Sequence, residues 1–366
     1  MRITGLAAVA AVLLTTAVSA QEKQIAQPSE GGDTAAAGQA VSDADLAKYR
    51  AARSANPEIS APMPQKFRSS PPPLTVEGFR QVTRSADGAV TQGDAPEGTR
   101  EAIERSRKAA GSIDRSRMQR RKIDDGDLEL AGDDARKQRM VVGTDDRVRV
   151  SPTNKFPFTT LGYVYSEYDD GTAGGCSGTL IAENLVLTAA HCVYRTEQSK
   201  WADYIAFIPA LDDRNAPFGK YEAKDWSILQ AYMDLSGTEY GFNHLANDIA
   251  VIQLKDPAGK RAGWLAYGYD DKLNGFNANI IGYPGDKPQG TMWRASCPID
   301  PNFIAPDLFE MDCDTYPGSS GSSMYAYYKS KNDRVVYGIN VASGSSHNYG
   351  LRITGPYFNW LQSFMK

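Results

Sequence analysis

Histidine and cysteine are scarce in this chain, and an excess of positive charge is lacking. Its 366 residues include three histidines and four cysteines, and the formal net charge is −4. A chain without a basic excess has no electrostatic case for binding nucleic acid or an anionic membrane surface, so we expect neither partner. No cluster of residues at metal-ligand spacing is visible in the sequence, and we expect neither a metal nor a cofactor.

A long apolar run near the amino terminus is also lacking. The stretch from Leu6 to Val18 is shorter than the roughly 20 residues that a membrane-spanning helix needs. A positive start at Arg2 and small residues up to Ala20 instead predict a signal peptide, residues 1–20, cleaved after Ala20. We therefore expect a secreted protein, extracellular or periplasmic, without stable membrane insertion. The even number of cysteines fits disulfides formed in such an oxidising compartment.

Residues 21–140 contain no cysteine and no tryptophan, and their only aromatic residues are Tyr49, Phe67 and Phe79. A charged segment this poor in apolar surface cannot bury enough of it to fold tightly alone. We interpret the segment as a largely disordered pro-segment, with a helix over Glu101 to Arg121 that forms when docked on the rest of the chain. An independent interaction module is the alternative.

A basic stretch, Arg136 to Arg139, comes near the end of this segment. Cleavage after Arg139 or Met140 would release a shorter chain that begins near Val141. The sequence therefore predicts three unequal pieces, of which residues 141–366 form the mature domain.

The pattern of residues 141–366 is all-β. Short runs rich in Val, Ile, Thr and Tyr recur between turns that contain Gly, Asp, Asn or Pro, as in a barrel or a sandwich. These runs are Leu161–Tyr165, Thr179–Ile181, Leu185–Thr188, Ile249–Leu254, Asn279–Ile281, Val335–Val341 and Leu351–Thr354. Only the tail after Pro356 has apolar residues at helical intervals, which predicts a C-terminal helix over 356–366.

His191 is the one histidine that follows an apolar run and precedes a cysteine, in the sequence Thr188-Ala189-Ala190-His191-Cys192. An imidazole fixed at the end of a buried strand is suited to act as a general base. His244 lies in a polar stretch and is expected at the surface, and His347 is expected in a loop.

Two later segments supply an acid and a nucleophile. Asp248 directly precedes the apolar run Ile249–Leu254, where a carboxylate is costly to desolvate unless a donor such as an imidazole N–H binds it. Ser320 lies between Gly318 and Gly321, which allow a tight turn that exposes its hydroxyl. A hydroxyl, a base and an orienting acid are the groups that acyl transfer to water requires.

These local sequences and their order, His then Asp then Ser, resemble the chymotrypsin-fold (trypsin-like) serine endopeptidases, in particular the bacterial glutamyl endopeptidase branch. The resemblance covers roughly residues 141–366. It implies two six-stranded antiparallel β-barrels, at about 145–258 and 262–354, followed by the C-terminal helix.

The same resemblance assigns roles to individual residues. It implies that His191, Asp248 and Ser320 are catalytic and that the N–H groups of Gly318 and Ser320 form the oxyanion hole. The segment from Cys176 to Ile181 resembles the strand opposite the catalytic histidine, which implies disulfides Cys176–Cys192 and Cys297–Cys313.

The match is weakest in the specificity pocket. Asn340 stands where the glutamyl branch typically has a histidine, and Thr315 matches a pocket hydroxyl of that branch. Asp314 occupies the position that gives trypsin its preference for Arg and Lys. Ser319 replaces the Asp that binds the new amino terminus in trypsin-like enzymes, so Val141 would instead help to build the pocket, as in the glutamyl branch. The edge of Val341-Ala342-Ser343 is expected to pair with the substrate backbone.

We therefore predict a secreted, monomeric serine endopeptidase that is made as a zymogen and cuts proteins or peptides after acidic residues. Its activating protease could be a second copy of itself. Two alternatives stay open: the same chemistry with a preference for Arg or Lys through Asp314, and a binding module that has the protease fold without turnover.

Overall fold

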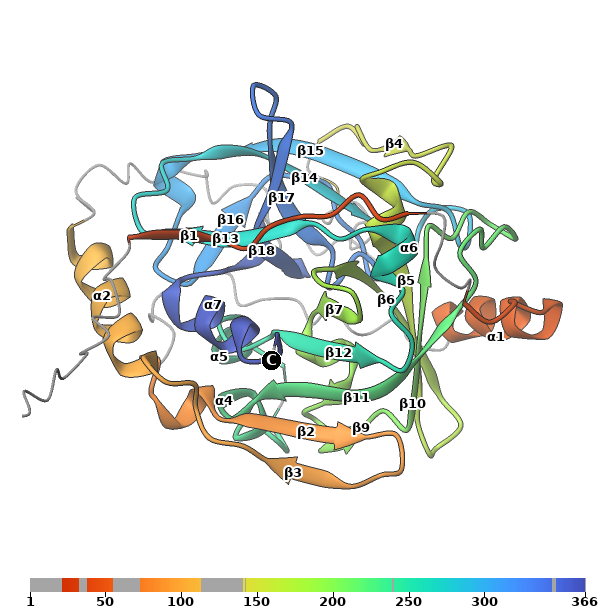
Figure 1. The fold of residues 1–366 in the computed structure, drawn as a ribbon, viewed down its shortest axis with the longest axis horizontal. Coiled ribbons are helices and arrows are strands. Elements are labelled where there is room, and N and C mark those ends of the chain that lie inside the picture. Colours follow the sequence, from red (N-terminus) through yellow and green to blue (C-terminus); the bar gives the residue numbers. More distant parts are fainter. Residues whose placement is uncertain are drawn as a thin grey trace, which may run out of the picture.

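The structure is a computed structural model, drawn in Figure 1. It describes residues 22–32, 38–54, 73–112, 141, 143–238, 240–343 and 347–365. The predicted signal peptide and the predicted cleavage residues Arg139 and Met140 lie outside these ranges. Among the described residues, no helix combines the length and the apolar character needed to cross a membrane.

The first predicted barrel is present and closed. Its hydrogen-bonded order is β10-β5-β6-β7-β12-β11, and β11 pairs back with β10, all antiparallel. The six strands are β5 (Leu161–Glu167), β6 (Ala173–Leu180), β7 (Leu185–Thr188), β10 (Tyr204–Pro209), β11 (Tyr221–Leu229) and β12 (Ala250–Leu254). Alternate side chains point inward along these strands, and the interior residues are almost completely buried.

The second barrel is formed by six further antiparallel strands. Its hydrogen-bonded order is β15-β14-β17-β18-β19-β16, and β16 lies beside β15. The strands are β14 (Phe276–Gly282), β15 (Trp293–Ile299), β16 (Leu308–Met311), β17 (Ser323–Tyr328), β18 (Asp333–Ser343) and β19 (Asn348–Arg352). The Cys297–Cys313 disulfide joins β15 to the segment just after β16, where the two strands are neighbours.

The predicted C-terminal helix is α7 (Gly355–Gln362). Tyr357, Trp360 and Leu361 point into the core and are fully buried. Tyr357 also donates its hydroxyl to the carbonyl of Ala246. The helical spacing of these apolar residues therefore identified the helix correctly.

Strand β13 (Ala266–Asp270) lies in the connection between the barrels and pairs in parallel with β18. β4 (Val148–Arg149) is added to β15. The short elements that complete this part of the chain are η4 (Phe158–Thr160), η5 (Ala190–Cys192), β8 (Tyr194–Arg195), β9 (Lys200–Trp201), α4 (Gln230–Met233), α5 (Phe242–Leu245), α6 (Gly259–Ala262) and η6 (Pro301–Phe303), where η denotes a 3-10 helix.

Within the predicted pro-segment, the described parts of residues 22–112 form short regular elements. They form β1 (Lys23–Ile25), α1 (Asp43–Ser54), η1 (Glu77–Phe79), β2 (Gln81–Ser85), β3 (Val90–Gln92) and α2 (Thr99–Ser112). Figure 1 shows these elements lying against the barrels, with α2 beside α7 and β1 along β13. The segment builds no core of its own, as its composition predicts, but its few apolar side chains join the core of the barrels.

Candidate active site

The predicted acid and base meet at the edge of the first barrel. His191 lies in η5, directly after β7, and Asp248 lies just before β12, which pairs with β7. One oxygen of the Asp248 carboxylate accepts the backbone N–H of His191 at 2.9 Å, and the other lies 2.6 Å from its Nδ1 atom. The carboxylate is fully buried and the imidazole is 5% exposed. These contacts fix the ring and direct its Nε2 atom away from Asp248.

Tyr240 is a further member of this cluster that the sequence did not reveal. Its hydroxyl donates to Asp248 at 2.6 Å, and its ring meets the imidazole of His191 edge-on at 5.7 Å. Burial and the nearby Asp248 carboxylate raise the pKa of Tyr240 well above its ordinary value, so the hydroxyl keeps its proton. Asp248 thus receives three hydrogen bonds, two of them from His191.

The expectation that His244 lies at the surface is wrong. It is 2% exposed and stacks on the ring of Tyr240 at 4.9 Å. Its Nδ1 atom accepts the N–H of Gly241 at 3.0 Å, and burial lowers the pKa of the imidazole. A neutral His244 therefore packs against the ring of Tyr240. The polar sequence around His244 gave no sign of this buried position.

Ser320 lies in the turn before β17, beside Cys192. Its carbonyl accepts the N–H of Ser177 in β6 at 2.8 Å and lies 3.9 Å from the sulfur of Cys192, which follows His191 in the chain. The Cys176–Cys192 disulfide is formed as expected and joins β6 to η5. Within the described part of the chain, neither the Ser320 hydroxyl nor the buried Nε2 atom of His191 has a hydrogen-bond partner. Neither group is thus held by another described residue, and the two are not hydrogen-bonded to each other.

Two peptide groups beside Ser320 are held by their carbonyl oxygens. The carbonyl of Pro317 accepts the N–H of Gly285 at 2.6 Å. The carbonyl of Ser319 accepts the N–H of Ser322 at 3.0 Å and the side-chain amide of Asn340 at 3.2 Å. Because the C=O and N–H of a trans peptide point in opposite directions, these bonds turn the N–H groups of Gly318 and Ser320 the other way. The N–H groups of Gly318 and Ser320 therefore point away from Gly285 and Asn340.

Gly318 and Ser177 complete the turn. Gly318 has a φ of +98°, and a Cβ added there would lie 2.4 Å from the carbonyl of Tyr283, so only glycine fits without strain. The Ser177 hydroxyl donates to the carbonyl of Gly318 at 2.8 Å and accepts the N–H of Tyr283 at 3.0 Å. A serine of the first barrel thus connects the turn to the second barrel.

The other predicted pocket residues gather near the base of this turn. Asp314 and Thr315 follow β16, and Asn340, Val341, Ala342 and Ser343 end β18; all are buried. The hydroxyls of Thr315 and Ser343 lie 3.1 Å apart. Asn340 turns its amide toward Ser319, so its nitrogen supports the turn. Val341 lies at a bulge, where the pairing of β18 with β19 shifts register.

Asp314 is connected to the segment that follows Val141. Its carboxylate accepts the N–H of Asp146 at 3.0 Å. The next residue, Arg147, has a guanidinium only 2% exposed, and it binds the carboxylates of Asp145, at 2.8 Å, and of Asp286. These charge-assisted bonds fix residues 145–147 on the second barrel.

The hydrogen bond from Arg147 holds the pKa of Asp145 well below its ordinary value. A lowered pKa stabilises the fold above the unfolded-state value of about 3.9, and this stabilisation is lost as the pH falls through the lower folded-state value. We expect Asp145→Asn to lower the urea midpoint at pH 7 and to have progressively less effect below about pH 4. Urea denaturation across this range checks it, and a difference that is independent of pH would contradict it.

One group of residues within the described chain has the spacing of metal ligands: Cys176, His191 and Cys192, whose donor atoms lie within 4.8 Å of one another. The two sulfurs are joined in a disulfide, so neither is the thiolate that binds a metal. The Nδ1 atom of His191 is already bonded to Asp248. Elsewhere, His347 lies just before β19, outside any strand as expected, and pairs with Asp312 at 2.7 Å. This donor set does not fit a metal centre.

Comparison with known proteins finds similarity to proteases. Residues 176–329 match the family described as trypsin-like peptidase domain. A protein of Bacillus licheniformis named glutamyl endopeptidase is 31% identical over 236 residues, which are 62% of this chain and 70% of that protein. A Bacillus subtilis protein named extracellular metalloprotease is 30% identical over 227 residues, 61% of this chain and 68% of that protein. A solved structure of a Glu endopeptidase in complex with MPD superposes with a TM-score of 0.53 at 25% identity, over 61% of this chain and 98% of that one.

Proposed function

Because this chain belongs to the family of trypsin-like serine endopeptidases, we propose that it hydrolyses peptide bonds through His191, Asp248 and Ser320. The observation that carries the proposal is the pair of buried contacts between His191 and Asp248, which leaves Nε2 as the one ring nitrogen able to take a proton. The position of Ser320 beside Cys192 supports its role as the nucleophile.

In this mechanism the Ser320 oxygen attacks the peptide carbonyl carbon while its proton passes to Nε2 of His191. The charge that develops on the carbonyl oxygen is bound by the N–H groups of Gly318 and Ser320. His191 then gives its proton to the leaving amine, and the C–N bond breaks to leave an acyl-enzyme. A water molecule, deprotonated by His191, releases the acid and regenerates the serine. Asp248 keeps its charge throughout and stabilises the imidazolium.

The metalloprotease name of one relative does not carry over to this site, because the cysteines near His191 are bound to each other. An organophosphonate probe tests the serine chemistry directly. We expect one covalent adduct per chain, which peptide mass spectrometry places on Ser320, and no adduct on Ser320→Ala. An adduct on another residue, or activity abolished by a metal chelator, would contradict the proposal.

We also propose that the protein is secreted after cleavage near Ala20 and matures by cleavage after Arg139 or Met140. The two disulfides fit an oxidising compartment. The anchoring of Asp146 to Asp314 supports a contribution of the nearby Val141 to the pocket, since it keeps the start of the mature chain close to that site.

For the substrate we propose cleavage after acidic residues. The hydroxyls of Thr315 and Ser343 can donate to a carboxylate, and relatives named glutamyl endopeptidase support this preference. The buried carboxylate of Asp314 favours the alternative, a preference for Arg or Lys, because a buried negative charge attracts a cation. Its bond to the Asp146 N–H gives that carboxylate a structural role instead.

Asp314→Asn separates the two preferences, because it removes the charge and leaves the side-chain size unchanged. We expect the wild-type enzyme to cut a peptide library after Glu or Asp, and the variant to keep or raise that activity. Mass spectrometry of the products measures both. Wild-type cuts after Arg or Lys that fall at least 100-fold in the variant, a loss on the scale of an unpaired buried charge, would establish the alternative.

A further inference from the structure

The described parts of residues 22–112, here called the N-terminal strap, contact both barrels. Strand β1 pairs antiparallel with β13, in register Lys23 with Asp270. The pairing continues past the strand, since Ser29 and Trp264 exchange two backbone hydrogen bonds of 3.0 and 2.7 Å. This part of the strap therefore covers the edge of β13 that is not bonded to β18, an edge that would otherwise present unpaired backbone groups.

The strap also extends the sheet of the first barrel. Strand β2 pairs with β11 over five residues, from Gln81 opposite Leu229 to Ser85 opposite Asp225. Figure 1 shows β2 and β3 running along β11 as a hairpin. Arg84 of β2 adds an ion pair to Asp203 at 2.5 Å.

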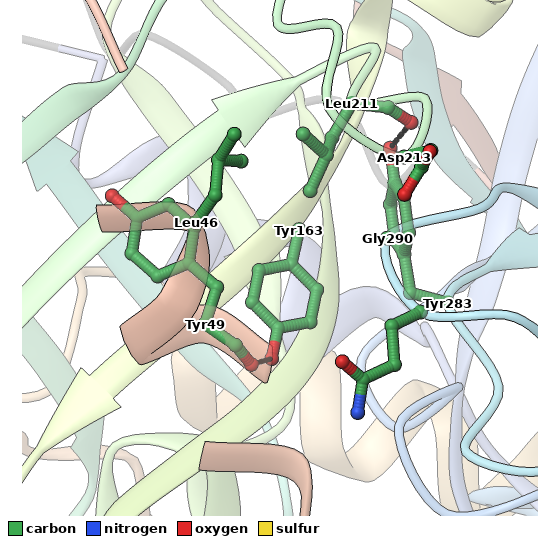
Figure 2. Close-up of a pocket in the computed structure, with 8 residues that line it drawn as sticks. Leu46, Tyr49, Tyr163, Leu211, Asp213, Tyr283 and Gly290 are labelled. Atoms are coloured by element: carbon green, nitrogen blue, oxygen red, sulfur yellow. Dashed lines mark hydrogen bonds between the residues drawn. The ribbon is translucent and has the colours of Figure 1, made fainter. Parts of the chain in front are cut away.

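Helix α1 closes over the place where the two barrels meet. Figure 2 shows Leu46 and Tyr49 facing Tyr163 of the first barrel, with Tyr283 of the second barrel lining the same small cavity. Tyr163 donates its hydroxyl to the carbonyl of Tyr49 at 3.2 Å. The ring of Tyr49 also packs on Tyr165 at 4.7 Å.

Helix α2 and the residues before it cover the C-terminal helix. Phe79 is 1% exposed and packs edge-on against Tyr357 of α7 at 5.0 Å. Ala102 and Ile103 of α2 are buried where α2 packs on α7. The apolar side chains of the strap that are at most 7% exposed are Leu46, Tyr49, Ala52, Phe79, Val82, Ala102 and Ile103.

The catalytic groups are not covered by this packing. None of the hydrogen bonds, ion pairs or ring contacts of the described strap residues involves His191, Asp248 or Ser320. The described strap residues therefore do not bind the catalytic side chains, as a segment that inhibited the enzyme at these groups would. The strap instead packs as part of the fold: its strands pair with two sheets, and its aromatic side chains are buried.

We propose that the N-terminal strap is a permanent part of the protease and that, after the chain is cut before Val141, it stays bound as a second polypeptide bracing both barrels. The partner of the surface formed by β11, β13 and α7 is thus the chain's own amino-terminal fragment. The proposal deepens the proposed maturation step, but it concerns the fate of the fragment and does not depend on which residues are catalytic.

The test introduces a recognition sequence for a site-specific protease between residues 130 and 131 of full-length Ser320→Ala protein, which cannot digest itself. After complete cutting, we expect both fragments to elute together in size-exclusion chromatography under native conditions and to separate in 6 M guanidinium. We also expect amide exchange of β11 and β13 to stay unchanged after the cut. The proposal would be overturned if the amino-terminal fragment eluted by itself and the remaining fragment, residues 131–366, kept the melting temperature of the uncut protein.

A matched pair of variants tests the anchors. Phe79→Ala removes a buried ring and should increase the rate at which the cut fragment exchanges with labelled fragment at least tenfold. Val90→Ala, at a strap residue that is 51% exposed, should leave that rate unchanged. Equal rates for the two variants would contradict the assigned interface. If Phe79→Ala does not fold, the co-elution of the parent fragments still decides the question.

Discussion

Ser320→Ala is expected to reduce kcat for peptide hydrolysis by about a million-fold, leaving only the residual acceleration that substrate binding and the oxyanion site provide. In the proposed mechanism the Ser320 hydroxyl is the one group that forms and breaks a covalent bond to the substrate, so its loss should remove the covalent pathway. The change removes a single oxygen from a side chain without a hydrogen-bond partner among the described residues, so the melting temperature should shift little.

Ser319→Ala is the matched control for this experiment. It removes a hydroxyl from the adjacent residue of the same turn, whose backbone N–H donates to the carbonyl of Tyr316 at 2.9 Å. We expect activity within tenfold of the wild type. Single-turnover assays with active-site titration measure both variants. Ser320→Ala protein with more than 1% of wild-type turnover, or a larger loss in Ser319→Ala, would show that Ser320 is not the nucleophile.

Asp248→Asn is expected to reduce kcat at neutral pH by about ten thousand-fold, because the amide favours the wrong imidazole tautomer. In this chain the substitution also disturbs two other donors. The backbone N–H of His191 and the hydroxyl of Tyr240 both point at the carboxylate, and an amide offers them one acceptor oxygen instead of two. Stopped assays across pH measure the loss, which should become smaller at high pH, where hydroxide can take the proton that His191 in the wrong tautomer cannot accept.

Tyr240→Phe separates the positioning of Asp248 from its charge. The variant keeps the ring that packs on His191 and removes only the hydrogen bond to the carboxylate. A hydrogen bond to a charged group contributes about 1.5–3 kcal/mol, so we expect kcat to fall about tenfold with KM unchanged. An unchanged kcat in Tyr240→Phe, or less than a hundredfold loss in Asp248→Asn, would contradict the assigned roles.

The sequence predicted best the features that depend on local pattern. Short runs rich in Val, Ile, Thr and Tyr marked the strands, and the spacing of Tyr357, Trp360 and Leu361 marked the final helix. His191 and Ser320 were selected as candidates because glycine, cysteine and apolar neighbours surround them in the sequence. Both disulfides were correct, but their pairing came from the family resemblance and not from the spacing of the cysteines.

Contacts between distant residues could not be predicted in this way. Tyr240 reaches Asp248 from a polar stretch that carries no apolar period, and His244 was misplaced for the same reason. Asn340 was expected in the pocket, but the direction of its amide toward Ser319 depends on a turn from another strand. The strap was underestimated because its sequence has too little apolar surface for a core of its own, although it has enough to complete the core of a neighbour.

The pairing of β1 with β13 affects the order in which this protein folds. Lys23 and Asp270 are partners across about 250 residues of sequence, so β1 cannot pair with β13 until that length of chain has been synthesised. Loop closure over such a span is slow, and the waiting strand is open to misfolding and to chaperones in the meantime. Pulse-labelled refolding should therefore find amide protection in β5–β6, which are adjacent in sequence, well before it appears in β13.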